Sequence, residues 1–559
     1  ARASRIIAAF SGGTVLSIDF LGKRVSGPFT IPSGIVTTAP SIIQRVMDEI
    51  PEIGVITTKS IGPVPRAGNR EPVYSQYAPG CFVNAVGLTN PGVDEALAGL
   101  QTLNVPDDRF LLVSVFGGNV DEFVEVAKKL APVADGLELN LSCPHAKGYG
   151  MAMGQDPALV AEIVAAVKAA VDVPVIPKLT PNADDIAAIG RAALEAGADG
   201  LCAINTVGPG YTEAHGHAVL SNGMGGMSGK GVLPIALKCL RALSEITDKP
   251  VIGCGGLSSA ADCRAARAAG ATILGVGSAL TGMDTPDLVE YFTALRHDLE
   301  HDSERAERLV RYDIDMHFSP VTVVENQRIC DDIAVVTFDR KVNIQAGEYV
   351  FVWIPGVGEK PFSCLTDDPL RLAVINVGQF TEACYQLQPG DTAYIRGPHG
   401  VPVTPPEDAK MLCVAGGTGL AAVYQIARDF GSDEQPAEIF AGARSAERLY
   451  FIDECRAIAD VTVATDDGSA GVAGRVTEPL RERLTTMSED ELARVVCYNC
   501  GPEPMIHAAE AVQREFLRND QIFSAIDYVT KCGVGICGAC ASPDGRRICV
   551  DGPFIQTAE

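Results

Sequence analysis

The first 300 residues alternate regularly between short runs of β-branched residues and alanine-rich segments in which apolar residues recur at helical spacing. Eight such runs predict β-strands, at residues 28–33, 54–59, 110–115, 136–141, 173–179, 200–206, 250–254 and 272–278. The segments between them, such as 156–171 and 184–197, end in glycine or aspartate turns. Eight β/α units favour an α/β fold of the (β/α)₈, or TIM-barrel, type over residues 17–302, rather than a doubly wound sheet.

Such a barrel carries its chemistry where the strands end, and polar residues gather at those positions. They are Lys59 and Ser60, Asn140, Lys178, and Asn205 and Thr206. Glycine-rich loops at 253–256 and 275–278 follow the last two strands and predict a phosphate cradle of backbone N–H groups. Tight turns are the alternative reading of each loop taken alone. A lysine at a strand end could stabilise negative charge on a reduced flavin, or could simply be solvated.

Four cysteines near the end of the chain have the spacing C-x₄-C-x₂-C-x₈-C: Cys532, Cys537, Cys540 and Cys549. The first three match the plant-type [2Fe–2S] spacing, with a fourth ligand supplied later. Gly533, Gly535 and Gly538 relax the backbone between them. Zinc is the alternative metal, but zinc sites usually use paired C-x₂₋₄-C knuckles, so this compact loop favours an iron–sulfur cluster.

The pattern changes between the barrel and the cysteine motif. Short alternating runs at 321–324, 334–338, 348–354 and 372–377 predict a small antiparallel barrel. After residue 410 the β/α pattern returns, and residues 411–422 form a strand, a glycine loop and a helix. Gly416, Gly417 and Gly419 in that loop resemble a nucleotide-binding fingerprint only by analogy, with a tight turn as the alternative.

The composition of the chain argues against several classes of function. The chain has 559 residues, of which 45 are basic and 70 acidic, giving a net charge of −25. No basic surface is large enough to follow a phosphate backbone, so we expect no nucleic-acid binding. No apolar run approaches 18 residues, so we expect no membrane span. The 17 cysteines are scattered, which favours metal-binding or catalytic thiols in a reducing, cytoplasmic setting over a disulfide framework.

Several segments of the barrel half resemble one enzyme family. They include Ser33-Gly34, the stretches at 58–60, 84–92, 140–145, 205–210 and 225–229, and both glycine loops. Together they resemble class 1B, NAD-dependent dihydroorotate dehydrogenase over residues 17 to about 300. The resemblance implies bound FMN and the oxidation of dihydroorotate to orotate. It implies an FMN site formed by Ser33, Gly34, Lys59, Ser60, Asn140, Lys178, Gly229, Gly255, Gly256, Gly277 and Ser278.

The same resemblance assigns the reacting groups. Cys143 would be the base that removes a proton from C5 of the substrate, with hydride leaving C6, although a buried structural thiol is the usual fate of a free cysteine. A thiol with the reference pKa of about 8.5 becomes a usable base slightly above neutrality. The substrate would be held by Lys59, Asn84, Gly87, Leu88, Asn140, Asn205 and Thr206. Asparagine amides suit this task because they both donate to and accept from imide edges.

Two positions in the barrel half depart from the family pattern. His145 stands where many members have asparagine, and residues 211–217 replace the sequence expected after the sixth strand. His215 and His217 in this segment could contact substrate or could be solvated loop residues. The segment therefore bears on substrate identity more than on flavin chemistry.

The C-terminal half, residues 319 to about 555, resembles the electron-transfer subunit of the same family, a relative of ferredoxin reductases. The resemblance rests on residues 360–363, 411–422, 465–469 and 498–504 together with the cysteine motif. It implies FAD and NAD sites formed by Lys360, Pro361, Phe362, Ser363, Gly378, Thr381, Gly416, Gly417 and Gly419. Lys360 departs from the usual arginine and would meet the FAD pyrophosphate as a point charge. Phe380 stands where a small glycine is usual.

Both halves lie on one chain, whereas the family builds them as two. We expect a tail at 1–16, the barrel at 17–302, a linker at 303–318, an FAD-binding barrel at 319–404, an NAD-binding domain at 405–520 and a [2Fe–2S] domain at 521–559. Electrons would pass from FMN to the cluster, then to FAD and NAD⁺, in a homodimer of fused chains. Two alternatives remain open: a flavin enzyme for another cyclic amide or enone, and an electron-transfer module with an inactive barrel.

Overall fold

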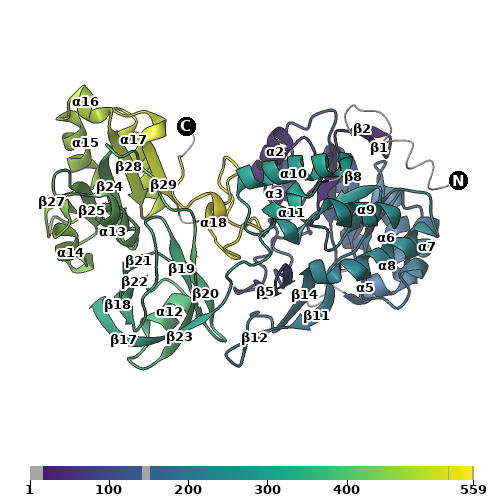
Figure 1. Cartoon of the computed structure of the whole chain (residues 1–559), viewed down its shortest axis with the longest axis horizontal. Coiled ribbons are helices and arrows are strands. Elements are labelled where there is room, and N and C mark those ends of the chain that lie inside the picture. Colours follow the sequence, from purple (N-terminus) through teal and green to yellow (C-terminus); the bar gives the residue numbers. More distant parts are fainter. Residues whose placement is uncertain (1–16, 142–150, 302, 527, 557–559) are drawn as a thin grey trace. The chain divides into compact units, whose positions relative to one another are not determined.

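The computed structural model describes residues 17–141, 151–301, 303–526 and 528–556 (Figure 1). Internal contacts divide the chain into two compact units. The first unit is Ala1–Ile314 together with Val534–Gly545, and the second is Asp315–Gly533 together with Arg546–Glu559. A short piece of the cysteine-rich segment therefore packs with the barrel half, although it lies more than 200 residues further along the chain.

The first unit is built on a closed parallel barrel with the strand order β10-β15-β16-β3-β4-β7-β8-β9. Its strands are β3 (Phe29–Ile31), β4 (Val55–Thr57), β7 (Phe110–Val115), β8 (Gly136–Asn140), β9 (Val175–Leu179), β10 (Leu201–Ala203), β15 (Val251–Cys254) and β16 (Ile273–Gly275). Each lies within one of the eight predicted runs, so the predicted (β/α)₈ barrel is confirmed.

Helices cover the outside of the barrel, and five of the eight begin at a residue whose side chain caps the helix. They are α2 (Pro40–Glu49), α3 (Val93–Leu100), α4 (Val120–Leu130), α6 (Pro157–Ala170), α7 (Ile186–Glu195), α8 (Leu233–Ser244), α9 (Ala260–Ala268) and α10 (Thr285–Glu300). Asn119, Asp156, Asp185, Ser259 and Asp284 each accept a backbone hydrogen bond at a helix start. These caps fix where the five helices begin and hence the length of the loop before each of them.

A hairpin and a second sheet complete the first unit. The hairpin of β1 (Ile18–Phe20) and β2 (Lys23–Val25) contributes Phe20 to the barrel core, where its ring meets that of Phe110 edge to face at 5.0 Å. The second sheet has the antiparallel order β11-β14-β6-β5, formed by Val207–Tyr211, Met224–Gly229, Cys81–Asn84 and Tyr74–Ala78. It joins residues from two separate connections, the one between β4 and β7 and the one between β10 and β15, at the functional end of the barrel.

The second unit begins with seven antiparallel strands in the order β20-β19-β23-β17-β18-β22-β21. They are β17 (Ser319–Cys330), β18 (Ile333–Phe338), β19 (Tyr349–Ile354), β20 (Gly358–Phe362), β21 (Cys364–Asp367), β22 (Leu370–Ile375) and β23 (Thr392–His399). The antiparallel pattern is as predicted. The hydrogen-bonded ladder stays open between β20 and β21, which the chain itself joins through Ser363.

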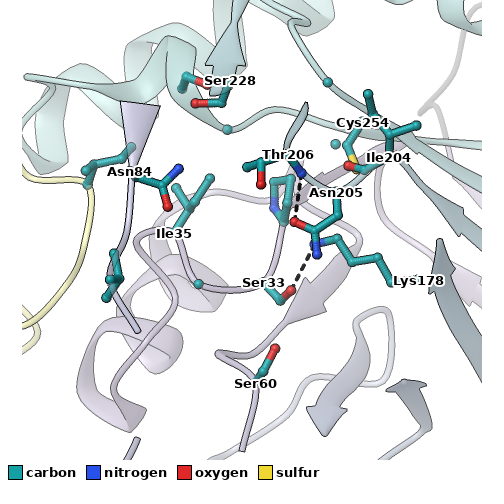
Figure 2. A pocket seen from close by; sticks show the side chains of 18 of the residues that line it. Ser33, Ile35, Ser60, Asn84, Lys178, Ile204, Asn205, Thr206, Ser228 and Cys254 are labelled. Atoms are coloured by element: carbon teal, nitrogen blue, oxygen red, sulfur yellow. Dashed lines mark hydrogen bonds between the residues drawn. The ribbon is translucent and has the colours of Figure 1, made fainter. Parts of the chain in front are cut away.

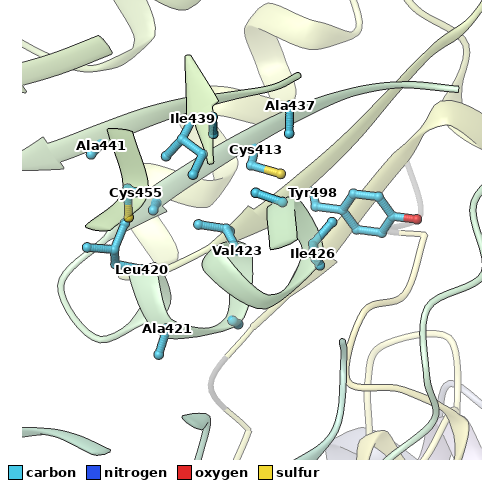
Figure 3. Close-up of a cluster of buried hydrophobic side chains, with 14 of the residues drawn as sticks. Cys413, Leu420, Ala421, Val423, Ile426, Ala437, Ile439, Ala441, Cys455 and Tyr498 are labelled. Carbon is cyan, nitrogen blue, oxygen red and sulfur yellow. The ribbon is translucent and has the colours of Figure 1, made fainter. Parts of the chain in front are cut away.

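A six-stranded parallel sheet follows, in the order β27-β26-β25-β24-β28-β29. Its strands are β24 (Lys410–Gly416), β25 (Ala437–Ala443), β26 (Ala459–Thr465), β27 (Val472–Ala473), β28 (Val495–Cys500) and β29 (Ile522–Ala525). Helix α13 (Gly419–Phe430) packs Leu420, Val423 and Ile426 onto β24 and β25 (Figure 3). Among the described residues, no helix is both long and apolar enough to cross a membrane.

Candidate active site

One pocket at the carboxyl ends of the barrel strands collects nearly all the predicted FMN and substrate residues (Figure 2). The predicted residues that line it are Ser33, Gly34, Lys59, Ser60, Asn84, Gly87, Leu88, Asn140, Lys178, Asn205, Thr206, Gly255, Gly256, Gly277 and Ser278. They come from the ends of at least seven strands, which the closed barrel brings together at one rim. Gly229 lines a smaller neighbouring cavity instead.

Lys178 is the buried cation of this pocket. It lies on β9 with 4% of its surface exposed, and its ammonium donates to the hydroxyl of Ser33 at 3.0 Å. Burial acts to lower the pKa of Lys178, but the Glu138 carboxylate together with Cys202 and Cys254 outweighs it and raises that pKa above the usual value. The side chain therefore stays charged and aimed into the pocket, and it is not the solvated rim lysine of the alternative interpretation.

A chain of hydrogen bonds orients the pocket amides. Buried Glu138 accepts from the hydroxyl of Ser114 at 2.8 Å, and that hydroxyl is 2.9 Å from the hydroxyl of Ser60. The amide of Asn140 donates to Ser60 at 2.9 Å and accepts from Asn205 at 3.3 Å. Because the Asn140 amide is bound through both its nitrogen and its oxygen, the orientation of the pocket amides is set before any ligand binds.

Backbone packing at the glycine loops leaves no room for side chains. A Cβ on Gly256 would lie 2.8 Å from the carbonyl oxygen of Gly229, and one on Gly229 would lie 2.1 Å from that of Gly80. Gly229 and Gly256 also have φ values of +91° and +81°. Three loops thus bring bare backbone together beside Ser278, which fits a group that is held by peptide N–H donors, such as a phosphate.

The segment after α10 lies over this glycine-rich end. It contains α11 (Arg305–Leu309) and Tyr312, and it belongs to the first unit. The hydroxyl of Tyr312 lies 3.0 Å from that of Ser258, and Lys230 donates to it at 3.2 Å. The Tyr312 carbonyl accepts from the N–H of Gly80 at 2.7 Å. Residues predicted as a linker therefore form part of the wall around the smaller cavity.

The predicted base, Cys143, and the neighbouring His145 lie outside the described residues. Their contribution to the pocket stays a prediction. The strand that precedes them, β8, ends at Asn140, which lines the pocket.

The divergent segment at 211–217 forms a small exposed hairpin. Strands β12 (Glu213–Ala214) and β13 (His217–Ala218) pair across it, and the histidine at its turn, His215, has a φ of +53°. Both His215 and His217 are exposed, and neither lines the main pocket. The structure supports the interpretation of the two histidines as exposed loop residues rather than substrate contacts.

Two of the pocket residues that were not predicted from the sequence come from the cysteine motif. Ile536 and Cys537 line the pocket, and the N–H of Val36 donates to the Ile536 carbonyl at 2.9 Å. Gly538 also packs tightly here, since a Cβ on it would lie 1.8 Å from the Thr38 hydroxyl oxygen. Sequence analysis could not pair these segments, because they are about 500 residues apart.

All four motif cysteines are buried, with 1% to 3% of their surface exposed. Gly533, Gly535 and Gly538 adopt φ values of +76°, +72° and +64°, as the predicted backbone turns require. Buried thiols and the glycine turns between them are the local features that thiolate ligation of a cluster requires. Cys537 and Cys540 belong to the first unit, whereas Cys532 and Cys549 belong to the second.

The predicted FAD residues occupy neighbouring elements of the second unit. Lys360, Pro361 and Phe362 lie on β20, and Gly378 precedes α12 (Gln379–Tyr385). The Thr381 hydroxyl oxygen accepts from the N–H of Gly378 at 3.0 Å, which closes that turn. Phe380, unusual for the family, is buried in the core of this sheet. Its departure from the family pattern is therefore a packing feature.

The predicted nucleotide loop lies between β24 and α13. Gly417 has a φ of +54°, and its carbonyl accepts from the Tyr450 hydroxyl at 2.7 Å. A Cβ on Gly419 would lie 2.1 Å from the carbonyl oxygen of Cys500, so only glycine allows the helix to start this close to β28. The loop is thus built by close backbone approach, as a nucleotide-binding turn requires.

Comparison with known families follows this division of the chain. The family model described as dihydroorotate dehydrogenase matches residues 15–294, half of the chain. The chain belongs to the dihydroorotate dehydrogenase family. A model described as the oxidoreductase NAD-binding domain matches residues 413–511, and the iron–sulfur cluster binding domain of dihydroorotate dehydrogenase B matches residues 529–559. The resemblance to a class 1B enzyme with both halves on one chain is confirmed.

Curated proteins that are similar to the barrel half carry the name of the same family. The catalytic subunit of dihydroorotate dehydrogenase B (NAD(+)) from Pyrococcus horikoshii is 45% identical over 270 residues, which is 48% of this chain and 86% of that protein. The corresponding subunit from Methanosarcina mazei is 44% identical over 267 residues, covering 47% of this chain and 84% of that protein. That of Methanosarcina acetivorans is 42% identical over 289 residues, with 51% and 91% covered.

Proposed function

We propose that this chain oxidises dihydroorotate to orotate and passes the electrons to NAD⁺. The observation that carries the proposal is the composition of one pocket. The residues expected to hold FMN and those expected to hold the substrate line the same cavity, and so does Cys537 of the iron–sulfur motif. A substrate, a flavin and an electron outlet would then meet at one place.

The groups that the chain would bind supply the redox chemistry. Bound FMN would accept the hydride from C6 of the substrate, the [2Fe–2S] cluster would carry single electrons, and FAD would pair them for transfer to NAD⁺. The protein supplies position and charge. Lys178 places a permanent cation in the pocket, and the Ser60–Asn140–Asn205 chain presents oriented amides to a planar pyrimidine. Cys143 would remove the C5 proton.

The second unit would complete the electron route. FAD would be held by the segment at 319–404, with Lys360 facing its pyrophosphate and Thr381 fixing the adjacent turn. NAD(H) would bind at the loop of Gly416, Gly417 and Gly419 between β24 and α13. Cys532, Cys537, Cys540 and Cys549 would hold the cluster. We also propose that the chain forms a homodimer of fused chains and works in the cytoplasm. Light scattering of the purified protein would test the dimer.

Anaerobic half-reactions test the function. Dihydroorotate is added to the purified full-length protein without oxygen, and flavin bleaching at visible wavelengths is followed before and after NAD⁺ is supplied. We expect bleaching by dihydroorotate, then recovery of flavin colour with formation of NADH and orotate. Flavin bleaching by NADH but not by dihydroorotate would overturn the proposal. In that case, bleaching by other cyclic amides or enones would identify a related reductase, and no bleaching by any of them would identify an electron-transfer module.

A further inference from the structure

The second unit contains a buried charged network that the proposed electron route does not use. Arg396 on β23 pairs with Glu359 on β20, and their side chains are only 1% and 0% exposed. Two bonds join them: the Nε of Arg396 donates to one carboxylate oxygen, and Nη2 donates to the other at 3.1 Å. The guanidinium also stacks on the ring of Phe351, 4.0 Å from its centroid.

The third member of the network is His399. Its Nε2 lies 3.1 Å from Nη1 of Arg396, and because a guanidinium can only donate, Nε2 accepts that bond. Burial and the adjacent cation lower the pKa of His399 to about 3, so the imidazole is neutral and carries its proton on Nδ1. The ring in turn hydrogen-bonds the backbone of Gly533. The order of contacts is thus Glu359, Arg396, His399 and the Gly533 backbone.

Gly533 directly follows Cys532, the first cysteine of the motif, and its backbone rests on this network. A Cβ on Gly533 would lie 2.6 Å from Cε2 of Phe351 and 3.2 Å from Nη1 of Arg396. Cys532 itself is 1% exposed. The Nη1 end of the Arg396 guanidinium therefore faces the Cys532 segment, while Glu359 binds the guanidinium through its Nε and Nη2 atoms.

A buried charged network of this kind adds little to the stability of the fold. A fully buried ion pair can often be replaced by apolar residues without loss, because removing two charges from water offsets their attraction. In the weakly polar interior, a charge close to a redox centre has a large effect on its reduction potential. Iron–sulfur potentials respond to net charge, to hydrogen bonds near the sulfurs and to exclusion of water.

We propose that Arg396 and His399 are positioning residues that hold the Cys532 segment and raise the reduction potential of the cluster. The inference rests on the proposed function, since it requires Cys532 to be a cluster ligand. A raised potential would favour electron flow from the substrate side into the cluster. Glu359 would moderate this effect by balancing the Arg396 charge, so the two partners should act on the potential with opposite signs.

The test is an EPR-monitored redox titration of the [2Fe–2S] signal in full-length protein that holds both flavins. The variant Glu359→Gln keeps a hydrogen-bond acceptor but removes the balancing charge, so we expect an upward shift of the midpoint potential. The double variant Glu359→Gln/Arg396→Gln replaces the ion pair by two amides of similar shape, so we expect a downward shift below wild type. The double variant is used because Arg396→Gln alone would leave Glu359 buried and unpaired.

Glu438→Gln is the matched control. Glu438 accepts from Arg483 at 2.7 and 2.8 Å in the parallel sheet of the second unit, and we expect its loss to leave the potential unchanged. Shifts of the same sign in Glu359→Gln and the double variant, or no shift in either, would overturn the inference and indicate a purely structural pair. A wild-type protein without any [2Fe–2S] signal would instead overturn the proposed function, so the two failures are distinguishable.

Discussion

The ammonium of Lys178 donates a hydrogen bond to the hydroxyl of Ser33 at 3.0 Å, which joins the end of β9 to the loop after β3 across the barrel mouth. The bond fixes the direction of a buried cation whose pKa the nearby Glu138 holds above its usual value. A charge that is fixed before the reaction stabilises developing negative charge without reorganisation.

Replacing Lys178 by methionine should slow flavin reduction by dihydroorotate. Loss of one such preorganised charge typically costs about 100- to 1,000-fold in rate. Anaerobic stopped-flow absorbance measures this step, and Lys178→Arg, which keeps the charge, should retain more of the rate. Equal loss in both variants would show that shape at this position matters more than charge.

Cys143→Ala should abolish most of the dihydroorotate half-reaction, since general-base catalysis usually contributes about 100- to 10,000-fold. In the wild type the reduction rate should rise with pH towards the reference pKa of a cysteine thiol, about 8.5, because only the thiolate accepts the proton. NADH should still bleach flavin in the variant. Rapid turnover of Cys143→Ala at neutral pH would rule out the thiol as the base.

Cys540→Ser should separate the two half-reactions. Loss of a cluster ligand interrupts single-electron transfer, so dihydroorotate should still bleach part of the flavin while NADH formation falls to near background. Iron content and EPR measure the cluster, and Cys263→Ser, at a buried cysteine outside the motif, is the control. Undiminished NADH formation without iron would exclude the cluster from the route.

Tyr312→Phe should weaken FMN binding and leave FAD in place. The variant loses the hydroxyl contacts to Ser258, Lys230 and Glu307, worth about 1 kcal/mol each, which hold this segment beside the glycine-rich loops. The ratio of released FMN to FAD measures the effect. Tyr385→Phe, which loses a hydroxyl bond to the Cys330 carbonyl in the second unit, is the control. Equal release of both flavins would indicate general loosening instead.

Lowering the pH should destabilise the segment after α10 that contains Tyr312, because Asp298 becomes protonated. Burial acts to raise the pKa of this carboxyl, but hydrogen bonds from Ser303 and from the Ala306 N–H outweigh it and lower the pKa below its usual value. The stabilisation is therefore present above the unfolded pKa of about 3.9 and is lost as pH falls through the lower folded value. We expect the FMN-release temperature of wild type to fall between about pH 5 and pH 3.

The Asp298→Asn variant should lose this acid sensitivity, because an amide does not titrate in that range. Asp453→Asn, at an exposed carboxylate, should behave as wild type. The same acid-dependent fall in Asp298→Asn and wild type would place the titrating group elsewhere.

Much of the fold and the pocket could be predicted because the signals are local. The eight strand runs, the cysteine spacing and the polar residues at strand ends each lie within a few residues of one another. Barrel topology then brings the strand ends together, so Lys178, Asn140 and Asn205 could be grouped before any contact was known. The predicted roles of Cys143 rest on its motif alone.

Contacts between distant segments could not be predicted in this way. The sequence by itself determined the barrel, the iron–sulfur motif and the family, because periodicity and spacing are written in consecutive residues. Only the tertiary structure decided that Ile536 and Cys537 line the barrel pocket, that Tyr312 lines the smaller cavity beside it, and that Arg396 and Glu359 form a buried pair. Each of these depends on chain packing across tens to hundreds of residues, for which no local pattern exists.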